Sequence, residues 1–445
     1  MKDRMMCPVW PTGIRQNHII LLLRCRGKKT DGQDKEQKLK KCVLGIILCI
    51  LLTGNSCREK EEIPEHENTE GTSGEITIMC TEAEYPEYQK FIKQTENELN
   101  LRITVLAYPE NADNRQAKIS TILASGEDSV DIFSVNDEMV SEFKYKGYLE
   151  PLNDAVMTEE ILSCYPESYM KNITMLDGNA YSVPYNMDIM MFWVNRSMIG
   201  DMDIRTEEDF RHMLEMNFGD GKYGYGSAWD SAYVYNELSE FINLFGGSYY
   251  DWDDPNTREA LEFLKEMVEK GETPIDQITD QYEQLEQKFM EGTYASIFVY
   301  SGVDMFIRAG VYEEDHIQLA PLPRFKENVT NIATWQYVLN KSSSNKEAAI
   351  RFLQYAASRE GSIAYAEYMN RLPARLDIIR EEELDIPGFE QLREYVENTE
   401  LKERPFSRNT MEDITSMGNL FQRYILEEIS LEEFCDGAQN ITDGF

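Results

Sequence analysis

The chain has 445 residues, with 44 Lys and Arg against 80 Asp and Glu, and a formal net charge of −36. A surface this acidic repels phosphate backbones and anionic lipid headgroups, which excludes nucleic-acid binding and polybasic membrane binding as functions. The length predicts two domains or lobes with real cores, and an aromatic content of 11% leaves rings available for a binding cleft.

The most apolar stretch of the chain lies near its N-terminus. Residues 42–52 are almost wholly apolar, two lysines precede them, and small or polar residues follow. This is the layout of a secretory signal, and the stretch is shorter than the about 20 apolar residues of a membrane span. We expect residues 1–57 to be a leader and signal peptide. Residues 1–38 fit an over-extended gene start, which N-terminal peptide mapping of the cellular protein would test.

Cys57 directly follows this signal. A small residue followed by Cys resembles a bacterial lipobox, in which Cys57 would be lipidated and become the mature N-terminus, although Gly54 stands where that motif usually has Leu. An ordinary cleavage or an uncleaved anchor are the alternatives. Without residues 1–56, which hold 11 basic and 4 acidic residues, 33 basic and 76 acidic residues remain, a net charge of −43.

Residues 58–75 are charged, polar and nearly free of large apolar side chains, which predicts a disordered tether. Beyond Cys57 only Cys80, Cys164 and Cys435 remain, with no CxxC pattern. These three predict neither a disulfide framework nor a zinc site; one disulfide is open, and buried free thiols are our expectation.

The body begins with strands and helices in alternation. Residues 75–82 and 101–108 are short apolar runs typical of strands, with an amphipathic helix over residues 86–100 between them. A helix ending at Gly126 and a third strand over residues 129–137 follow. This β-α-β-α-β order is typical of a parallel sheet covered by helices, and ligands bind at the carboxyl ends of such strands. Glu82 and Asp137, each just past a strand, are therefore candidate site residues, and Asp137 could instead be the N-cap of the helix after it.

The rest of the chain continues the alternation. Asp177 and Gly178 predict a hairpin turn, and a strand covers residues 189–194. The intervening segment contains Pro184, which limits strand pairing and suggests a crossing between lobes. Further helices are expected near residues 206–216, 232–247, 256–271 and 344–358 and from Arg404 onward, and further strands at residues 294–302, 316–325 and 335–343. The fold class is α/β.

Five segments of the sequence, taken in this order, carry a more specific pattern than the alternation of strands and helices. These are "DIFSVNDEMVSEFKYKGYLEPLND", "LDGNAYSVPYNMDIMMFWVNRSMI", "FMEGTYASIFVYSG", "LAPLPRF" and "NKSSSNKEAAIRFLQYAAS". Together they resemble an extracellular solute-binding protein of family 1 of ABC importers, the group that includes maltose- and oligosaccharide-binding proteins. Asn179 replaces the Lys of that family's Asp-Gly-Lys segment, and "IATWQ" keeps only Trp335 of its Gly-Gly-Trp-Gly.

The resemblance implies a two-lobed periplasmic-binding-protein-like fold of type II, in which each lobe is a sheet flanked by helices and a hinge joins the lobes. The first lobe would cover residues 76–184 and 332–373, and the second residues 185–331 and 374–445. The implied function is capture of a small solute, most often a sugar or oligosaccharide, in the interlobe cleft and its delivery to the permease subunits of an ABC importer. No cofactor or metal is implied, and we expect a monomer, exported and anchored as a lipoprotein at the cell surface or in the periplasm.

Sugars offer hydroxyls to carboxylates and flat C–H faces to aromatic rings. From their places after or beside strands, the candidate ligand-binding residues are Glu82, Asp137, Asp188, Trp229, Tyr300 and Trp335. Arg404 is added because it resembles a position near the cleft in some relatives. For the carboxylates, exposure to solvent is the alternative, and for the aromatic residues it is packing in the core.

Two other function classes remain open at this point. Two carboxylates across a cleft also suit a glycoside-acting enzyme. The part after Cys57 holds only three His residues, however, and neither a nucleophile elbow nor a metal cluster is visible. The second class is an extracellular sensor subunit that presents solute to a membrane kinase.

Overall fold

The computed structural model describes residues 73–108, 112–300, 306 and 316–443, all of which belong to one compact unit that covers residues 70–445. The lipidation site predicted at Cys57 and residues 58–72 of the predicted tether lie outside the described residues. The last residues of that tether are structured instead: Arg351 donates to the Ser73 hydroxyl at 2.6 Å, and Glu75 begins the first strand. No helix within the described ranges is long and apolar enough to cross a membrane.

The predicted β-α-β-α-β start is confirmed. It consists of β1 (Glu75–Cys80), α2 (Pro86–Leu99), β2 (Arg102–Ala107), α3 (Ala112–Ser125) and β3 (Ile132–Asn136). Strand β1 pairs in parallel with β2 on one side and with β3 on the other. Helix α2 is amphipathic, and its buried residues Tyr88, Phe91, Ile92 and Thr95 recur at helical spacing. Local patterning therefore determines this part of the fold.

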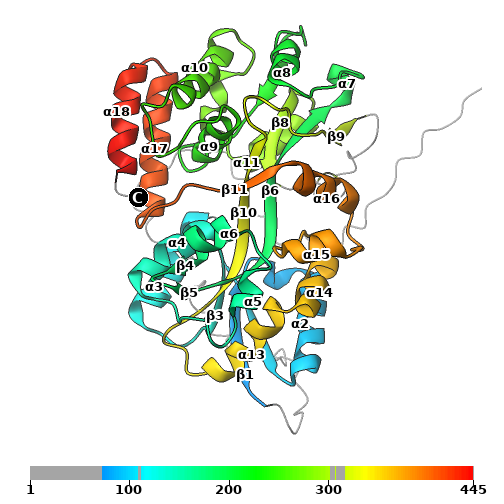
Figure 1. Ribbon diagram of the computed structural model, residues 1–445, viewed down its shortest axis with the longest axis vertical. Helices are drawn as coiled ribbons and strands as arrows, with labels where there is room; N and C mark the ends of the chain where they lie inside the picture. Colours follow the sequence, from blue (N-terminus) through cyan, green and yellow to red (C-terminus); the bar gives the residue numbers. More distant parts are fainter. Residues whose placement is uncertain (1–72, 109–111, 301–305, 307–315, 444–445) are drawn as a thin grey trace, which may run out of the picture. The chain divides into compact units, whose positions relative to one another are not determined.

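Two long strands run through the sheet and connect its two ends. They are β6 (Val183–Asn195) and β10 (Val329–Leu339), and the main sheet has the order β2-β1-β3-β10-β6-β8-β7. In Figure 1 both strands run through the centre, between the helices at one end of the sheet and those at the other. The remaining strands of this sheet are β7 (Tyr223–Gly226), β8 (Tyr294–Tyr300), β9 (Ile317–Leu319) and β11 (Glu400–Glu403).

Pro184 corrects one expectation. It lies inside β6 and pairs with Gln336 of β10, so the predicted break in strand pairing does not occur there. The register between β6 and β10 shifts next to this pair, between Trp335 and Gln336. A bulge is a position where a strand tolerates proline, because the ladder hydrogen bonds are already interrupted.

The first group of helices and turns after β3 leads to the long strand β6. It consists of α4 (Asp137–Lys146), α5 (Glu159–Leu162), α6 (Glu167–Tyr169), the π-helix η2 (Met170–Thr174) and the hairpin β4 (Met175–Leu176) and β5 (Asn179–Ala180). The hairpin turn predicted at Asp177 and Gly178 is confirmed, with positive φ at both residues.

The remaining helices cover the two ends of the sheet. They are α7 (Arg196–Ile199), α8 (Glu207–Leu214), α9 (Val234–Leu244), α10 (Pro255–Glu269), α11 (Tyr282–Met290), α13 (Lys346–Ala357), α14 (Arg359–Met369), α15 (Leu376–Glu381), α16 (Phe389–Asn398), α17 (Thr410–Ile425) and α18 (Leu431–Thr442), with short 3₁₀ turns η1 (Glu82–Glu84) and η3 (Ile275–Thr279). One hydrophobic cluster extends from Ile76 in β1 to Ala438 in α18, so burial of apolar surface holds both ends of the sheet together.

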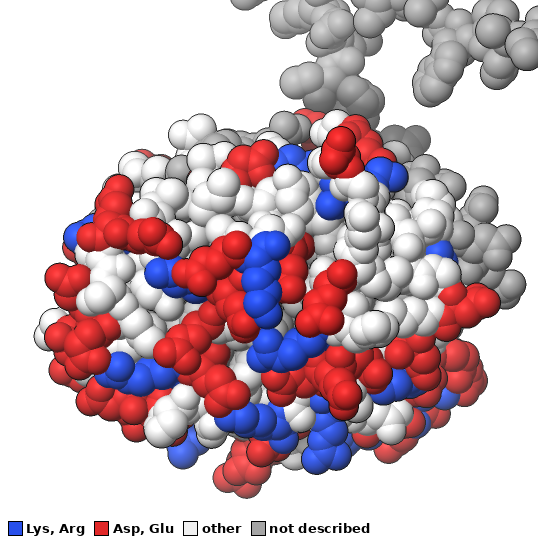
Figure 2. Space-filling view, turned by 90° about the horizontal axis from the view of Figure 1, so that it is seen from above, with Lys and Arg blue, Asp and Glu red and all other residues white. Residues whose placement is uncertain are grey.

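The acidic composition is visible on the surface. Figure 2 shows one face, where Asp and Glu side chains are widely spread and Lys and Arg side chains lie among them. Several of these charges form ion pairs, such as Arg258 with Glu432 at 2.8 Å and with Asp253 at 3.0 Å. Because these carboxylates are exposed, each pair contributes little to stability.

Candidate functional site

Strand register places several candidate side chains on one face of the sheet. Trp335 of β10 lies directly opposite Asn136 of β3 and opposite Asn186 of β6, so the three side chains form a row across three strands. Asp188 is two residues beyond Asn186 and therefore faces the same side. The Asn186 side-chain amide donates a hydrogen bond to Asp188 at 3.1 Å. Trp335 thus lies within a strand rather than just ahead of one.

The same face continues to Tyr300. Met190 follows Asp188 by two residues and pairs with Tyr300 of β8. The Tyr300 hydroxyl donates to Oδ1 of Asn236 in α9 at 3.1 Å. The two long strands therefore bring Trp335, Asp188 and Tyr300 to one side of the sheet, although 147 residues separate Asp188 from Trp335.

Arg404 is the centre of a buried polar group, which we name the Arg404 cluster: Asp137, Glu138, Tyr235, Asn236 and Arg404. The guanidinium forms ion pairs with Asp137 and, at 2.8 Å, with Glu138, the first two residues of α4. It also donates to the Tyr235 hydroxyl and, at 3.0 Å, to Oδ1 of Asn236, both in α9. Tyr235 in turn donates to Glu138. Arg404 is only 5% exposed, so these bonds join α4 and α9 away from water.

Aromatic rings surround the same guanidinium. The Cζ atom of Arg404 lies 5.5 Å from the ring centres of Tyr235 and Tyr300 and 5.0 Å from that of Phe406. A different guanidinium makes a further cation–π contact: Cζ of Arg115 in α3 lies 5.6 Å from the ring centre of Trp335. Rings and charged groups thus alternate across the site, an arrangement that can contact both the polar and the apolar faces of a ligand.

Asp137 is fully buried and is not the helix N-cap. Asn136 caps α4, since its side chain accepts a hydrogen bond from the backbone N–H of Met139 at 3.2 Å. The Asp137 carboxylate instead accepts a hydrogen bond from the Tyr169 hydroxyl at 3.2 Å and pairs with Arg404. Burial raises the pKa of Asp137, and the positive charge of Arg404 opposes this shift.

A second polar group lies around Glu82. Glu82 is 2% exposed, and its Oε2 atom has no hydrogen-bond partner among the described residues; the same is true of Oδ1 of the buried Asn186. Burial raises the pKa of the Asp188 carboxyl, the positive charge of Arg371 lowers it, and the negative charge of Glu82 raises it. The two carboxylates and Arg371 are thus within electrostatic reach of one another.

Trp229 does not join these groups. It is 0% exposed and packs edge-on against Phe421 of α17, with ring centres 5.2 Å apart. Its carbonyl accepts a hydrogen bond from the Gln422 side chain at 2.9 Å. The polar neighbours of Trp229 in sequence suggested an accessible ring, but the packing of α17 covers it.

Sequence reasoning missed four residues that bond to Asp137 or Arg404. Glu138 follows a predicted site residue directly, whereas Tyr169, Tyr235 and Asn236 lie on helices far away in sequence. The sequence carries no clear signal for α9: its polar residues lie on one side of the helix, as in a surface helix, yet the structure buries all its residues. Buried polar side chains need hydrogen-bond partners, and the Arg404 cluster supplies them for Tyr235 and Asn236.

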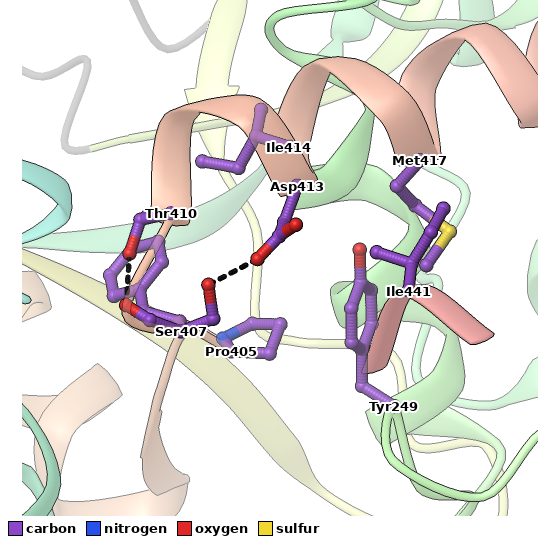
Figure 3. Close-up of a pocket in the computed structure, with 9 residues that line it drawn as sticks. Tyr249, Pro405, Ser407, Thr410, Asp413, Ile414, Met417 and Ile441 are labelled. Carbon is purple, nitrogen blue, oxygen red and sulfur yellow. Dashed lines mark hydrogen bonds between the residues drawn. The ribbon is translucent and has the colours of Figure 1, made fainter. Parts of the chain in front are cut away.

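A small cavity lies beside the segment that carries Arg404 (Figure 3). Its volume is about 10 Å³, room for roughly one water molecule. Ser407 donates to the Asp413 carboxylate, and the Thr410 hydroxyl donates to the carbonyl oxygen of Ser407 at 2.6 Å. The cavity is too small for a sugar, and these bonds fix the start of α17 next to the Arg404 cluster.

Among the described residues there is neither a disulfide nor a group of side chains suited to a metal ion. Cys80 and Cys435 are buried free thiols, as expected, whereas Cys164 is a free thiol that is only half-buried. Among the residues that the structure describes, no three His, Cys, Asp or Glu side chains lie together in a way that could hold a metal ion. The side chains that the structure brings together at the site are carboxylates, amides, guanidinium groups and aromatic rings.

Comparison with known proteins identifies a matching family and related folds. Residues 72–386 match the bacterial extracellular solute-binding protein family. A solute-binding protein of an ABC transporter from Thermotoga lettingae, bound with alpha-D-tagatose, has a TM-score of 0.71 and 19% identity and covers 83% of this chain and 99% of its own. Maltose-bound MalE3 of T. maritima has a TM-score of 0.68 and 18% identity, with coverage of 83% and 99%.

A third similar structure is the GacH receptor of Streptomyces glaucescens, solved unliganded and with acarbose. Its TM-score is 0.69 and its identity 18%, over 83% of this chain and 97% of that chain. Similarity at this level of identity shows the fold. The expectation of a two-lobed α/β fold, with sheets flanked by helices, is confirmed.

Proposed function

Because the chain belongs to the bacterial extracellular solute-binding protein family, we propose that it is the solute-binding subunit of an ABC importer. In this proposal it captures a sugar or oligosaccharide between its lobes and delivers it to a membrane permease. The similar structures support the class of solute, since their titles name tagatose, maltose and acarbose as bound molecules. Coverage of almost the whole of those chains supports the same overall role.

The Arg404 cluster is the observation that carries the proposal. With lobes of residues 76–184 plus 332–373 and 185–331 plus 374–445, Asp137 and Glu138 belong to the first lobe, and Tyr235, Asn236 and Arg404 to the second. In this proposal the cluster joins the two lobes through the contacts of Arg404, which is 5% exposed. Buried polar groups at an interface that opens are available to hydrogen-bond a solute when the lobes separate.

We assign ligand contacts to six of the predicted residues: Glu82, Asp137, Asp188, Tyr300, Trp335 and Arg404. Unpartnered acceptor atoms on Glu82 and Asn186 support contacts with hydroxyl donors. The half-buried Trp335 supplies a ring for a sugar face. Trp229 is left out because its ring packs within the core.

The remaining parts of the proposal concern chemistry and location. Members of this family bind solutes, which supports capture of the solute without turnover. The extracellular character of the family supports export, and the signal-like residues 42–56 followed by Cys57 support a lipid anchor at that cysteine. A monomer with one lipid anchor is the form that we propose.

Isothermal titration of residues 58–445 with maltose, maltotriose, D-tagatose, D-mannitol and acarbose tests the function. We expect at least one of these to bind, and Arg404→Met to weaken that binding at least about tenfold, a loss typical of a buried interface residue. Arg423→Met is the matched control, because Arg423 is 54% exposed and its ion-pair contact with Glu428 is 3.8 Å long. A folded protein that binds none of these compounds would contradict the sugar class, and recovery of shortened sugar products would instead indicate an enzyme.

A further inference from the structure

Lys144 is a buried lysine near the C-terminal end of α4. It is 3% exposed, and its Nζ atom donates hydrogen bonds to the backbone carbonyl oxygens of Asn172 at 2.8 Å, Ile173 at 2.6 Å and Met175 at 3.1 Å. An ammonium group has three N–H donors and no acceptor, so these carbonyls satisfy it completely. Buried ammonium groups persist only with such compensation, which makes this a specific contact.

The three acceptors belong to the π-helix η2 and the residue that follows it. The last carbonyl groups of a helix lack partners within the helix, and a lysine side chain supplies donors for them. A π-helix is rare and occurs often at functional sites. Lys144 therefore stabilises the end of an unusual turn, Met170–Thr174, by donating to carbonyl groups at and just after its last residues.

Tyr169 directly precedes this π-helix and reaches the Arg404 cluster. Its hydroxyl lies 3.2 Å from the Asp137 carboxylate and 2.5 Å from Oγ1 of Thr334, and it accepts a hydrogen bond from Nε2 of Gln336 at 3.0 Å. Tyr169 is thus joined to the π-helix through its backbone and to the Asp137 carboxylate through its hydroxyl.

One face of α4 carries both Asp137 and Lys144. Asp137, Ser141 and Lys144 are spaced at i, i+4 and i+7, which places them in one row on a helix, and all three are buried. Asp137, the first residue of this row, belongs to the Arg404 cluster. Lys144, the last residue, bonds the turn that directly follows Tyr169. The helix therefore fixes the carboxylate and its hydroxyl donor relative to each other.

We propose that Lys144 is a positioning residue of the solute site, which holds the π-helix η2 so that the Tyr169 hydroxyl stays on the Asp137 carboxylate. This inference rests on the proposed function, because it gives Lys144 a role in a site that the proposed function assigns to solute. The alternative is that Lys144 stabilises the fold without any effect on Asp137.

Titration of Asp137 separates these alternatives without any solute. The full chain, purified in mild detergent and labelled with ¹³C at the Asp carboxyl carbons, would be followed by NMR against pH, with Asp137→Asn to assign the signal. The charged groups and hydroxyls that act on Asp137 are Arg404, Glu138 and Tyr169. Because Tyr169 donates to the carboxylate and favours its charged form, Tyr169→Phe should raise the pKa of Asp137 by about half a unit or more.

Lys144→Met keeps the apolar stem and removes the three donors, and we expect it to raise the pKa of Asp137 in the same direction. The double variant should show no further rise. Lys146→Met is the matched control on the same helix, because this lysine is 40% exposed and pairs with Glu142; it should leave the titration unchanged. An unchanged pKa of Asp137 in Lys144→Met, or additive shifts in the double variant, would overturn the inference.

Hydrogen exchange gives a second measurement if Lys144→Met is unstable. At pH 7, amides of Met170–Met175 should exchange at least about tenfold faster in Lys144→Met than in the wild type, while β1 and α2 remain protected. Equal exchange in η2 would overturn the inference. Titrations of the same variants with the five compounds named above are read separately. If the wild type binds none of these compounds, the sugar class fails, while the titration of Asp137 still decides the role of Lys144.

Discussion

Arg404 and Asp137 are 267 residues apart in sequence and form a buried ion pair. Asp137 begins α4, directly after β3, and Arg404 follows β11, directly before the segment that leads into α17. The pair connects the first part of the chain to its last part, and Tyr235 and Asn236 of α9 complete it. The stability of the protein and its candidate site thus depend on the same contact.

Arg404→Met should lower the free energy of unfolding by about 3–5 kcal/mol, because it leaves the buried carboxylate of Asp137 without its positive partner. Urea unfolding followed by circular dichroism measures this change. Arg423→Met, at an exposed position of α17, should change the stability by less than about 0.5 kcal/mol. Equal stability of the two variants would show that Asp137 is adequately compensated by other groups.

Glu240 in α9 should make the protein less stable as pH rises. Burial raises the pKa of this carboxyl from 4.5 to about 8, so the folded state binds a proton that the unfolded state has released. The Thr330 hydroxyl lies 2.7 Å from the Met190 carbonyl oxygen and 2.9 Å from Oε1 of Glu240. A hydroxyl has one hydrogen, so a protonated Glu240 that donates to Thr330 satisfies all three groups. The stabilising contribution is complete below about pH 4.5 and is lost as pH rises towards 8.

Glu240→Gln keeps a donor for Thr330 and an acceptor for the Asn331 backbone N–H, which bonds Oε2 of Glu240 at 2.9 Å. Between pH 5 and 7.5, the free energy of unfolding of the wild type should therefore fall more steeply than that of the variant, by about 1.4 kcal/mol per pH unit. Urea titrations at several pH values measure the slopes. Glu262→Gln, at an exposed carboxyl of α10, is the control. Parallel slopes for the wild type and Glu240→Gln would show that Glu240 is ionised in the folded protein.

The first part of the fold could be predicted because its signals are local. The alternation of apolar residues in β1 and the helical spacing of Tyr88, Phe91 and Thr95 in α2 depend only on neighbours in sequence. The same reasoning placed Asp137 at the end of a strand. It could not show that Arg404 would meet this carboxylate, because that contact depends on how segments 267 residues apart fold together.

The surroundings of Trp229 and Tyr235 could not be predicted from their neighbours in sequence. The polar neighbours of Trp229 predicted an accessible ring, but α17 covers it completely. Tyr235 lies in a segment predicted only as a helix, yet its hydroxyl bonds Glu138 inside the molecule. Whether a side chain is covered depends on the element that packs over it, and a single sequence does not contain that information directly.

The two tryptophans should respond differently to truncation. Trp229→Ala removes a fully buried ring and should cost about 3–5 kcal/mol of stability. Trp335→Ala removes a half-buried ring and should cost markedly less, while it weakens the binding of any sugar that the wild type binds. Thermal unfolding and titration calorimetry on the same samples separate the effects. If Trp229→Ala were the variant that lost binding at unchanged stability, the core position of Trp229 would be wrong.

Gly418 should resist substitution although it lies in a helix. Alanine stabilises an exposed helix position by about 1 kcal/mol relative to glycine. A Cβ atom on Gly418 of α17, however, would lie 2.0 Å from the backbone carbonyl oxygen of Ser231, in the segment that leads into α9. Neither backbone can yield without separating α17 from the helix that carries Tyr235 and Asn236.

Gly418→Ala should therefore destabilise the protein by about 1–3 kcal/mol, as expected for overpacking. Gly437→Ala is the matched control in the neighbouring helix α18, because the added Cβ would meet the flexible end of the Leu420 side chain, at 2.8 Å. Since that side chain can rotate away, the gain in helix propensity should offset most of the cost, and Gly437→Ala should stay within about 1 kcal/mol of the wild type. Urea unfolding of both variants tests the difference. A stabilised Gly418→Ala protein would mean that α17 lies farther from Ser231 than the structure shows, and that the helix does not hold α9 in place beside the Arg404 cluster.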